Sequence, residues 1–168
     1  MRRDVTSLNV WALFRDRQGV AWFDDIFVGP SMGTRGVNLA RDAEAADADA
    51  SVVLDGLTGP DAPILHRGSS EQGHSLEFRW PAPIQVTRAV IHWPEGEKRP
   101  RSSTEFALQY HNGREWVYWA VGHIYMPEQQ SVLEAAPVFT DRLRYVQAPR
   151  GGSVDARHEL SMVEIEVF

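Results

Sequence analysis

The side chains best suited to recognition chemistry in this 168-residue chain are aromatic residues, arginines and histidines that fall between short apolar segments. An aromatic ring can stack on the apolar face of a pyranose, and a planar guanidinium group can donate paired hydrogen bonds to neighbouring hydroxyls. This combination favours a carbohydrate ligand. The candidate ligand-binding residues are His66, Arg67, Trp93, Arg99, Arg101, His123, Tyr125, Arg150 and His158.

Each candidate also has an ordinary structural interpretation. Trp93 ends an apolar segment, where a tryptophan more commonly closes a core than forms a binding platform. A single arginine in a loop is usually just solvated. The grouping of these residues therefore carries more weight than any one of them.

The sequence does not predict a catalytic centre. It has no Gly-x-Ser-x-Gly elbow, no glycine-rich phosphate loop and no His-Glu-x-x-His helix. Glu164 and Glu166 have the spacing that places two carboxylates on one face of a strand, as glycosidases require. We interpret them instead as the solvent side of the closing strand, with the intervening apolar residues facing inward. We therefore expect the chain not to be an enzyme.

Composition excludes several other classes. There are no cysteines, which rules out disulfides and thiolate metal sites. The net charge of -6, without a Lys/Arg run, gives no nucleic-acid footprint. The apolar runs are strand-sized, so no membrane span is expected. No stretch of signal-peptide length is present, so we expect any export signal to lie outside this chain.

The pattern of apolar residues predicts many short strands. Leu76, Phe78 and Trp80 alternate with polar residues, which is the period of a half-buried strand. Asn112-Gly113 is a strong hairpin signal. We predict tight turns at residues 81–83 and 140–141, and a solvated connecting segment at residues 38–50. The fold class is therefore all-β, an antiparallel β-sandwich or jelly roll. The expected strands cover residues 75–80, 84–93, 106–110, 116–121, 132–139, 143–146 and 160–168.

The connections between these strands differ in length according to the end of the sandwich. In an antiparallel chain, successive connections fall alternately at opposite ends. The three tight turns should share one end. The four long connections, residues 57–73, 94–103, 122–130 and 148–157, should share the other. Long loops at one rim of a rigid scaffold commonly build a binding surface.

The order of these segments resembles discoidin domains, also called coagulation factor V/VIII type C domains, which include the family-32 carbohydrate-binding modules. The resemblance covers residues 37–168. It implies an eight-stranded jelly roll of the galactose-binding-like fold. The matching motifs are Asn38-Leu39-Ala40, Val53-Leu54-Asp55-Gly56, Ser75-Leu76-Glu77-Phe78, Tyr110-His111-Asn112-Gly113-Arg114-Glu115-Trp116, Leu143-Arg144-Tyr145-Val146 and the closing residues 160–168.

This resemblance implies a non-catalytic module that targets a larger extracellular carbohydrate-active protein to glycans, with adjacent domains of that protein as further partners. A discoidin-type protein-interaction or structural domain without a sugar ligand is the alternative. The resemblance also implies a structural Ca²⁺ site at Asp55, Thr58 and Glu164, completed by backbone carbonyls. Leu57 departs from the family, which often has a polar residue there, and Asp61 could substitute as a ligand.

Residues 1–30 do not belong to this pattern. They predict an extra β-hairpin, whose Phe23-Asp24-Asp25-Ile26 segment is similar to the last strand of other carbohydrate-binding sandwiches. We interpret this hairpin as the remnant of a preceding β-sandwich domain.

Overall fold

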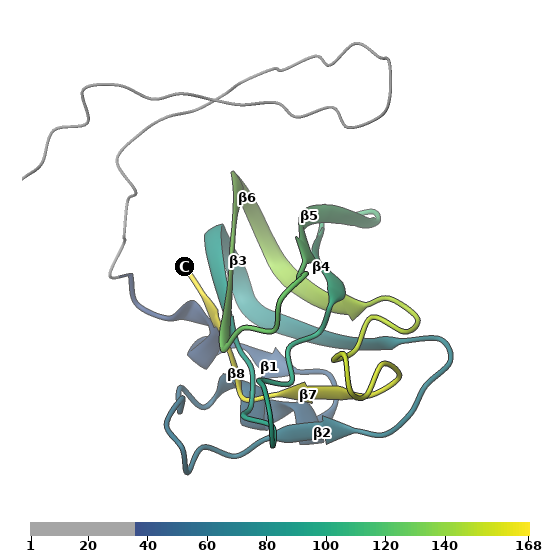
Figure 1. Cartoon of the computed structure of the whole chain (residues 1–168). Helices are drawn as coiled ribbons and strands as arrows, with labels where there is room; N and C mark the ends of the chain where they lie inside the picture. Colours follow the sequence, from purple (N-terminus) through teal and green to yellow (C-terminus); the bar gives the residue numbers. More distant parts are fainter. Residues whose placement is uncertain (1–35) are drawn as a thin grey trace, which may run out of the picture. The chain divides into compact units, whose positions relative to one another are not determined.

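The computed structural model of the chain describes residues 36–168 (Figure 1). The predicted N-terminal hairpin over residues 1–30 lies outside the described residues. Two 3₁₀ helices open the described part, and strands form the rest. In chain order the elements are η1 (Leu39–Asp42), β1 (Glu44–Ala45), η2 (Ala48–Leu54), β2 (Leu65–Arg67), β3 (His74–His92), β4 (Glu105–His111), β5 (Trp116–His123), β6 (Gln130–Gln147), β7 (Leu160–Met162) and β8 (Glu164–Val167).

The described strands pair in antiparallel fashion throughout, which confirms the predicted fold class. The larger sheet has the order β1-β3-β6-β4-β5, and β8 pairs with the second half of β3. Strands β2 and β7 form a separate two-stranded sheet. No helix of the described residues is long and apolar enough to cross a membrane.

Two of the predicted turns are wrong, because the chain bends there within continuous strands. Strands β3 and β6 pair from His74↔Gln147 to His92↔Gln130, with a register shift between Arg79 and Ile84. Proline has no backbone N–H to donate to the ladder, so Pro81-Ala82-Pro83 interrupts the pairing without ending the strand. Residues 140–141 lie at the matching point of β6. Both strands therefore bend together (Figure 1).

These bends bring both ends of β3 and β6 to the same side of the molecule. The hydroxyl of Thr140, at the bend, donates to the carbonyl of His111, which places the tight β4–β5 turn beside the bends. At the opposite side the long loops contact one another. The amide of Ile124 donates to the carbonyl of Thr104, and that of Thr104 to Gly151. Because two of the three predicted tight turns are bends within strands, only the β4–β5 turn remains of the predicted tight-turn end.

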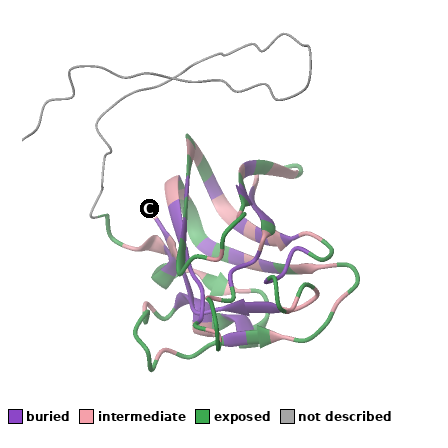
Figure 2. Ribbon diagram, in the orientation of Figure 1, coloured by how far each residue is buried: buried purple, intermediate pink, exposed green. Residues whose placement is uncertain are grey.

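The core lies between the two layers that the bends create. Leu76, Ile91, Tyr145 and Ile165 are fully buried, and buried residues alternate with more exposed ones in the first half of β3 and the second half of β6 (Figure 2). Burial of such side chains, at roughly 25 cal/mol per Å² of apolar surface, is the main stabilising contribution.

The segment 38–50 is largely exposed, as the sequence suggested, but it contains η1, β1 and the start of η2 and is anchored on the core by two alanines. Ala40 and Ala50 are fully buried, because their small side chains allow the 3₁₀ turns to approach the sheet closely. The side-chain oxygen of Asn38 accepts from Ala40 N and from Val167 N, each at 3.0 Å. The indole N–H of Trp80 donates to the carbonyl of Leu39 at 2.7 Å. These bonds tie the start of the domain to its closing strand.

Candidate functional site

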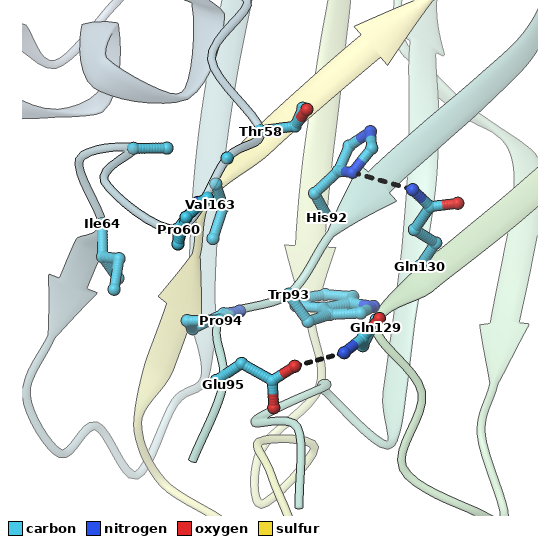
Figure 3. A pocket seen from close by; sticks show the side chains of 12 residues that line it. Thr58, Pro60, Ile64, His92, Trp93, Pro94, Glu95, Gln129, Gln130 and Val163 are labelled. Carbon is cyan, nitrogen blue, oxygen red and sulfur yellow. Dashed lines mark hydrogen bonds between the residues drawn. The ribbon is translucent and has the colours of Figure 1, made fainter.

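A cavity of about 450 Å³ opens at the long-loop side, where the loop before β2 meets the end of β3 and the start of β6 (Figure 3). Ile64 and Pro94 contribute apolar surface to it, and Trp93 forms part of the lining. The polar side chains that line it are Thr58, His92, Glu95, Gln129 and Gln130. It thus has apolar surface beside several hydrogen-bonding groups.

The polar lining is held in two linked pairs. The side-chain amide of Gln129 donates to the carboxylate of Glu95. The amide of Gln130 donates to Nδ1 of His92 at 3.2 Å, and Nε2 of His92 lies 2.9 Å from Glu166. Because an amide nitrogen only donates, Nδ1 accepts and Nε2 carries the proton toward Glu166. Both nitrogens of His92 are engaged, so this ring orients its neighbours and is not a free base.

Trp93 is a core residue at the base of this cavity. It is only 4% exposed, its indole N–H donates to the hydroxyl of Ser131 at 2.7 Å, and its ring meets Phe106 edge-on at 5.4 Å. Such a ring is not open for stacking on a sugar. The structure therefore favours the core interpretation of Trp93.

Two of the candidate arginines lie in the loop that leaves β3. The guanidinium of Arg99 contacts the carboxylate of Asp155 at 3.2 Å, which links this loop to the one before β7. Arg101 is exposed, and its backbone N–H donates to the carbonyl of Pro94, a residue of the cavity lining. Arg101 therefore lies next to the cavity, and Arg99 braces the loop that carries it.

Two further candidates occupy strand β2 and are engaged elsewhere. The guanidinium of Arg67 donates to the carboxylates of Asp47 and Asp49, at N–O distances of 3.0 and 2.9 Å. Arg67 therefore links β2 to η2. His66 is half exposed and shares a 3.1 Å hydrogen bond with the hydroxyl of Ser161.

The other candidates are spread along the same rim. The rings of His123 and Tyr125 are 5.2 Å apart, and Tyr125 is 88% exposed. Arg150 is exposed and has a φ of 62°. His158 accepts at its carbonyl from Ser70 N and from the ring of His74.

His92, Glu95, Gln129 and Gln130 were not among the candidate ligand-binding residues that the sequence predicted. All four lie at the junctions of long loops with β3 and β6. Their position in the sequence could have identified them, because polar residues directly at the ends of strands face the rim. The residue types typical of sugar contacts, aromatic rings and arginines, pointed to other positions.

Of the three residues implied as calcium ligands, Asp55 and Thr58 are exposed and Glu164 is buried. The expectation that Glu164 lies on the solvent side of the closing strand is wrong, because Glu164 is fully buried. Its Oε1 accepts from Gly56 N at 3.1 Å and from the amide of Asn38 at 3.4 Å. Its Oε2 is buried without a partner among the described residues. Desolvation by burial raises the pKa of Glu164 to about 8, and the charge of Asp55 adds to this rise. Thr58 also lines the rim cavity.

The fit of a metal to this cluster rests on Glu164 and Asp55. Within residues 36–168, no three His, Cys, Asp or Glu side chains are grouped to hold a metal. Carbonyl oxygens would complete a calcium shell, as this hard cation accepts. In the structure the guanidinium of Arg41 donates to the carbonyls of Asp55 and Gly56, at 3.5 and 3.4 Å. The unpaired buried oxygen of Glu164 is the feature that fits a cation.

The fold is similar to those of several solved carbohydrate-binding modules. One is a module from Clostridium perfringens (CpGH89CBM32-5) in complex with GalNAc-β-1,3-galactose, with 16% identity, 78% of this chain and 98% of that chain covered, and a TM-score of 0.63. The family 32 module of Streptococcus pneumoniae EndoD has 14% identity, coverage of 79% and 99%, and a TM-score of 0.64.

A third structure is chitosan-binding module 1 of a chitosanase/glucanase from Paenibacillus sp. IK-5, with 16% identity, coverage of 79% and 99%, and a TM-score of 0.59. No protein-family model matches the sequence, and no curated protein matches it. At these identities the similarity establishes the fold, which is the galactose-binding-like β-sandwich that the sequence resemblance implied.

Proposed function

We propose that this chain is a non-catalytic carbohydrate-binding module and that the rim cavity holds the sugar. The observation that carries the proposal is the cavity lining, where Glu95, Gln129 and Gln130 surround apolar surface from Ile64 and Pro94. Vicinal hydroxyls need paired donors and acceptors, and the ring carbons need apolar contact. The similarity to modules solved with GalNAc-β-1,3-galactose and to a chitosan-binding module supports the same ligand class.

The polar groups of the cavity support binding rather than turnover. General acid–base catalysis requires a free proton donor or acceptor at the reacting bond. His92 has both ring nitrogens occupied, and Glu95 is held by Gln129. We infer that these groups fix the orientation of a sugar and leave its bonds intact.

A glycan-array screen of the full chain tests this proposal. We expect a hit on galactose-type or amino-sugar glycans. Glu95→Ala and Gln130→Ala should each weaken binding about tenfold or more, because each removes a hydrogen bond at the sugar. Arg67→Ala is the matched control, since Arg67 pairs with Asp47 and Asp49 and should leave the affinity unchanged.

A blank array, or binding that survives both cavity substitutions, would contradict the assignment. The alternative is a discoidin-type protein-interaction or structural domain. Tyr125 and Met126 favour it, because they are 88% and 80% exposed on one loop. A blank array together with a captured protein partner lost on Tyr125→Ala would establish that alternative.

We also propose that Glu164 and Asp55 form a calcium site, with Thr58 as the third residue that the resemblance implies. The buried, unpaired Oε2 of Glu164 supports this site. A cation there would offset the cost of burying the carboxylate. Its role would be structural, because Glu164 joins β8 to the turn at Gly56.

We propose finally that the module acts outside the cell, joined to further domains of a carbohydrate-active protein. The ligand class supports this location, because polysaccharides and surface glycans are extracellular. The chain can be fused to a reporter and expressed in a secreted form and in a form retained inside the cell. Comparison of the reporter signal on glycan-coated cells would show whether the secreted form is recruited to them.

A further inference from the structure

A second hollow, of about 410 Å³, lies on the outer face of the sheet at strand β5. In the sheet order β1-β3-β6-β4-β5 this strand stands at the free end (Figure 1). Tyr118 and Val121 of β5 are 65% and 63% exposed, and both line the hollow. Ala107 of β4 and Val146 of β6 also line it. None of these residues belongs to the rim cavity.

A bulge in β5 creates this arrangement. Residues three apart on a regular strand point to opposite faces. The pairing of β4 with β5 shifts register between Leu108 and Gln109, so that Leu108 opposes Ala120 while Gln109 opposes Tyr118. Trp119 is the extra residue, and it turns inward to donate from its indole N–H to the carbonyl of Ala136. Tyr118 and Val121 therefore share the outer face.

The hollow combines an open aromatic ring with hydrogen-bonding groups. Gln72 and Glu105 line it together with Tyr118. Small Ala107, paired with both Val121 and Val146, leaves depth beside the ring. An exposed ring next to amide and carboxylate groups matches a pyranose, whose face is apolar and whose rim carries hydroxyls. Among the described lining residues Glu105 is the one charged side chain, so the hollow disfavours anionic sugars.

The neighbouring surface argues against a protein partner. The guanidinium of Arg144 lies 4.4 Å from the ring centre of Trp116 and donates to the side chain of Gln109. The charged side chain of Arg144 therefore interrupts the apolar surface between Trp116 and Tyr118. A stable protein interface needs a continuous apolar centre of several hundred Å². A sugar chain needs only separate rings and polar groups.

We propose that the outer face of β4 and β5 binds an uncharged, linear oligosaccharide, with Tyr118 as its stacking platform. This proposal rests on the proposed function for the class of ligand, but the site is separate from the rim cavity. Strand β5 runs toward the rim, since His123 pairs with Glu105. A polysaccharide can therefore follow the strand, whereas a monosaccharide at the rim does not reach Tyr118.

Affinity electrophoresis of the full chain in gels that contain β-1,4-galactan or hydroxyethyl cellulose tests the proposal, with galactose titration as the comparison. Tyr118→Ala should weaken retention by about tenfold, which is the scale of one lost aromatic stacking contact. Tyr118→Phe should retain the wild-type mobility shift because it keeps the ring. Phe139→Ala is the matched control, because Phe139 is 70% exposed but lies at the bend of β6.

The outcomes separate this site from the proposed function. Unchanged retention of Tyr118→Ala, with retention lost on Glu95→Ala, would overturn the outer-face site and leave the rim module intact. No retention or galactose binding by the wild type would overturn both. Analytical ultracentrifugation measures the oligomeric state. If the wild type is a dimer and Tyr118→Ala is a monomer, this face binds a second copy of the chain, and the oligosaccharide site is wrong.

Discussion

Glu164 has one carboxylate oxygen paired and the other buried without a partner among the described residues. Its pKa is raised to about 8, mainly by desolvation, whereas the unfolded chain has an ordinary value near 4.5. Between these values the folded state binds a proton that the unfolded state has lost. The stabilisation from this group is thus complete at low pH and is lost as the pH rises through about 8.

We therefore expect the free energy of unfolding of the metal-free protein to fall between about pH 4.5 and pH 8, by up to ~1.4 kcal/mol per pH unit from this group. Urea unfolding at a series of pH values in a chelator measures this slope. Glu164→Gln keeps the acceptor for Gly56 and should flatten it. An unchanged slope in that variant would show that Glu164 does not carry the effect.

Single residues were also where sequence reasoning was weakest. Arg67 and Arg101 look alike in the sequence, yet Arg67 is held by two aspartates at the start of η2, whereas Arg101 lies exposed beside the cavity. That difference depends on which loops meet in space. Trp93 was named as a candidate ligand-binding residue, but the structure buries it in the core, because a large ring at a strand end has more apolar surface to bury than a rim position offers.

At the scale of elements, the β4–β5 turn depends on a single glycine. Gly113 has a φ of 94°, and no atom lies within 4 Å of the position a Cβ would take. The side-chain oxygen of Asn112 accepts from the amides of Arg114 and Glu115 and fixes the turn. Gly113→Ala therefore adds backbone strain without a clash.

We expect Gly113→Ala to lower the free energy of unfolding by about 1–2 kcal/mol, measured by thermal or urea denaturation. Gly59→Ala is the control. Gly59 is equally open to solvent, but its φ lies outside the left-handed region, so the change should be close to neutral. Equal effects in the two variants would contradict the assignment of strain to Gly113.

The elements show why most of the fold could be predicted and part could not. Alternation at Leu76, Phe78 and Trp80 specifies a strand, and Asn112-Gly113 specifies a hairpin, because both signals are local. Pro81 and Pro83 gave an equally local signal, but a proline interrupts a ladder whether the chain reverses or only bends. Whether the chain reverses or only bends at these prolines depends on the partner strand β6, which pairs with β3 on both sides of the bend.

At the scale of the whole molecule, the bends in β3 and β6 determine where the rim cavity forms. Because both strands return to one side, they collect the loops that build the rim cavity. The solved modules of similar fold share the architecture at 14–16% identity, so the frame persists while nearly all side chains differ. The lengths of the connections suggested a binding rim. Which side chains meet there depends on contacts between loops that are distant in the sequence, and these bring Glu95, Gln129 and Gln130 to one cavity.

The proposed calcium site connects the beginning and the end of this frame. Asn38 bonds both Glu164 and Val167, and Glu164 bonds Gly56, so η1, the turn after η2 and β8 meet at one buried carboxylate. A cation that binds this junction in the folded state alone should stabilise the whole domain. The gain follows mass action and reaches ~2.7 kcal/mol at a hundredfold excess over the dissociation constant.

We therefore expect the melting temperature of the full chain to rise with calcium concentration and to return to its starting value after chelation, when measured at about pH 8.5, above the pKa of Glu164. Mg²⁺ at the same concentration should have little effect, since it requires a small, nearly ideal octahedral shell. Glu164→Gln should abolish the response. A wild-type melting temperature that is indifferent to calcium would exclude the site, and Arg41 would then be the cation that the carbonyls of Asp55 and Gly56 retain.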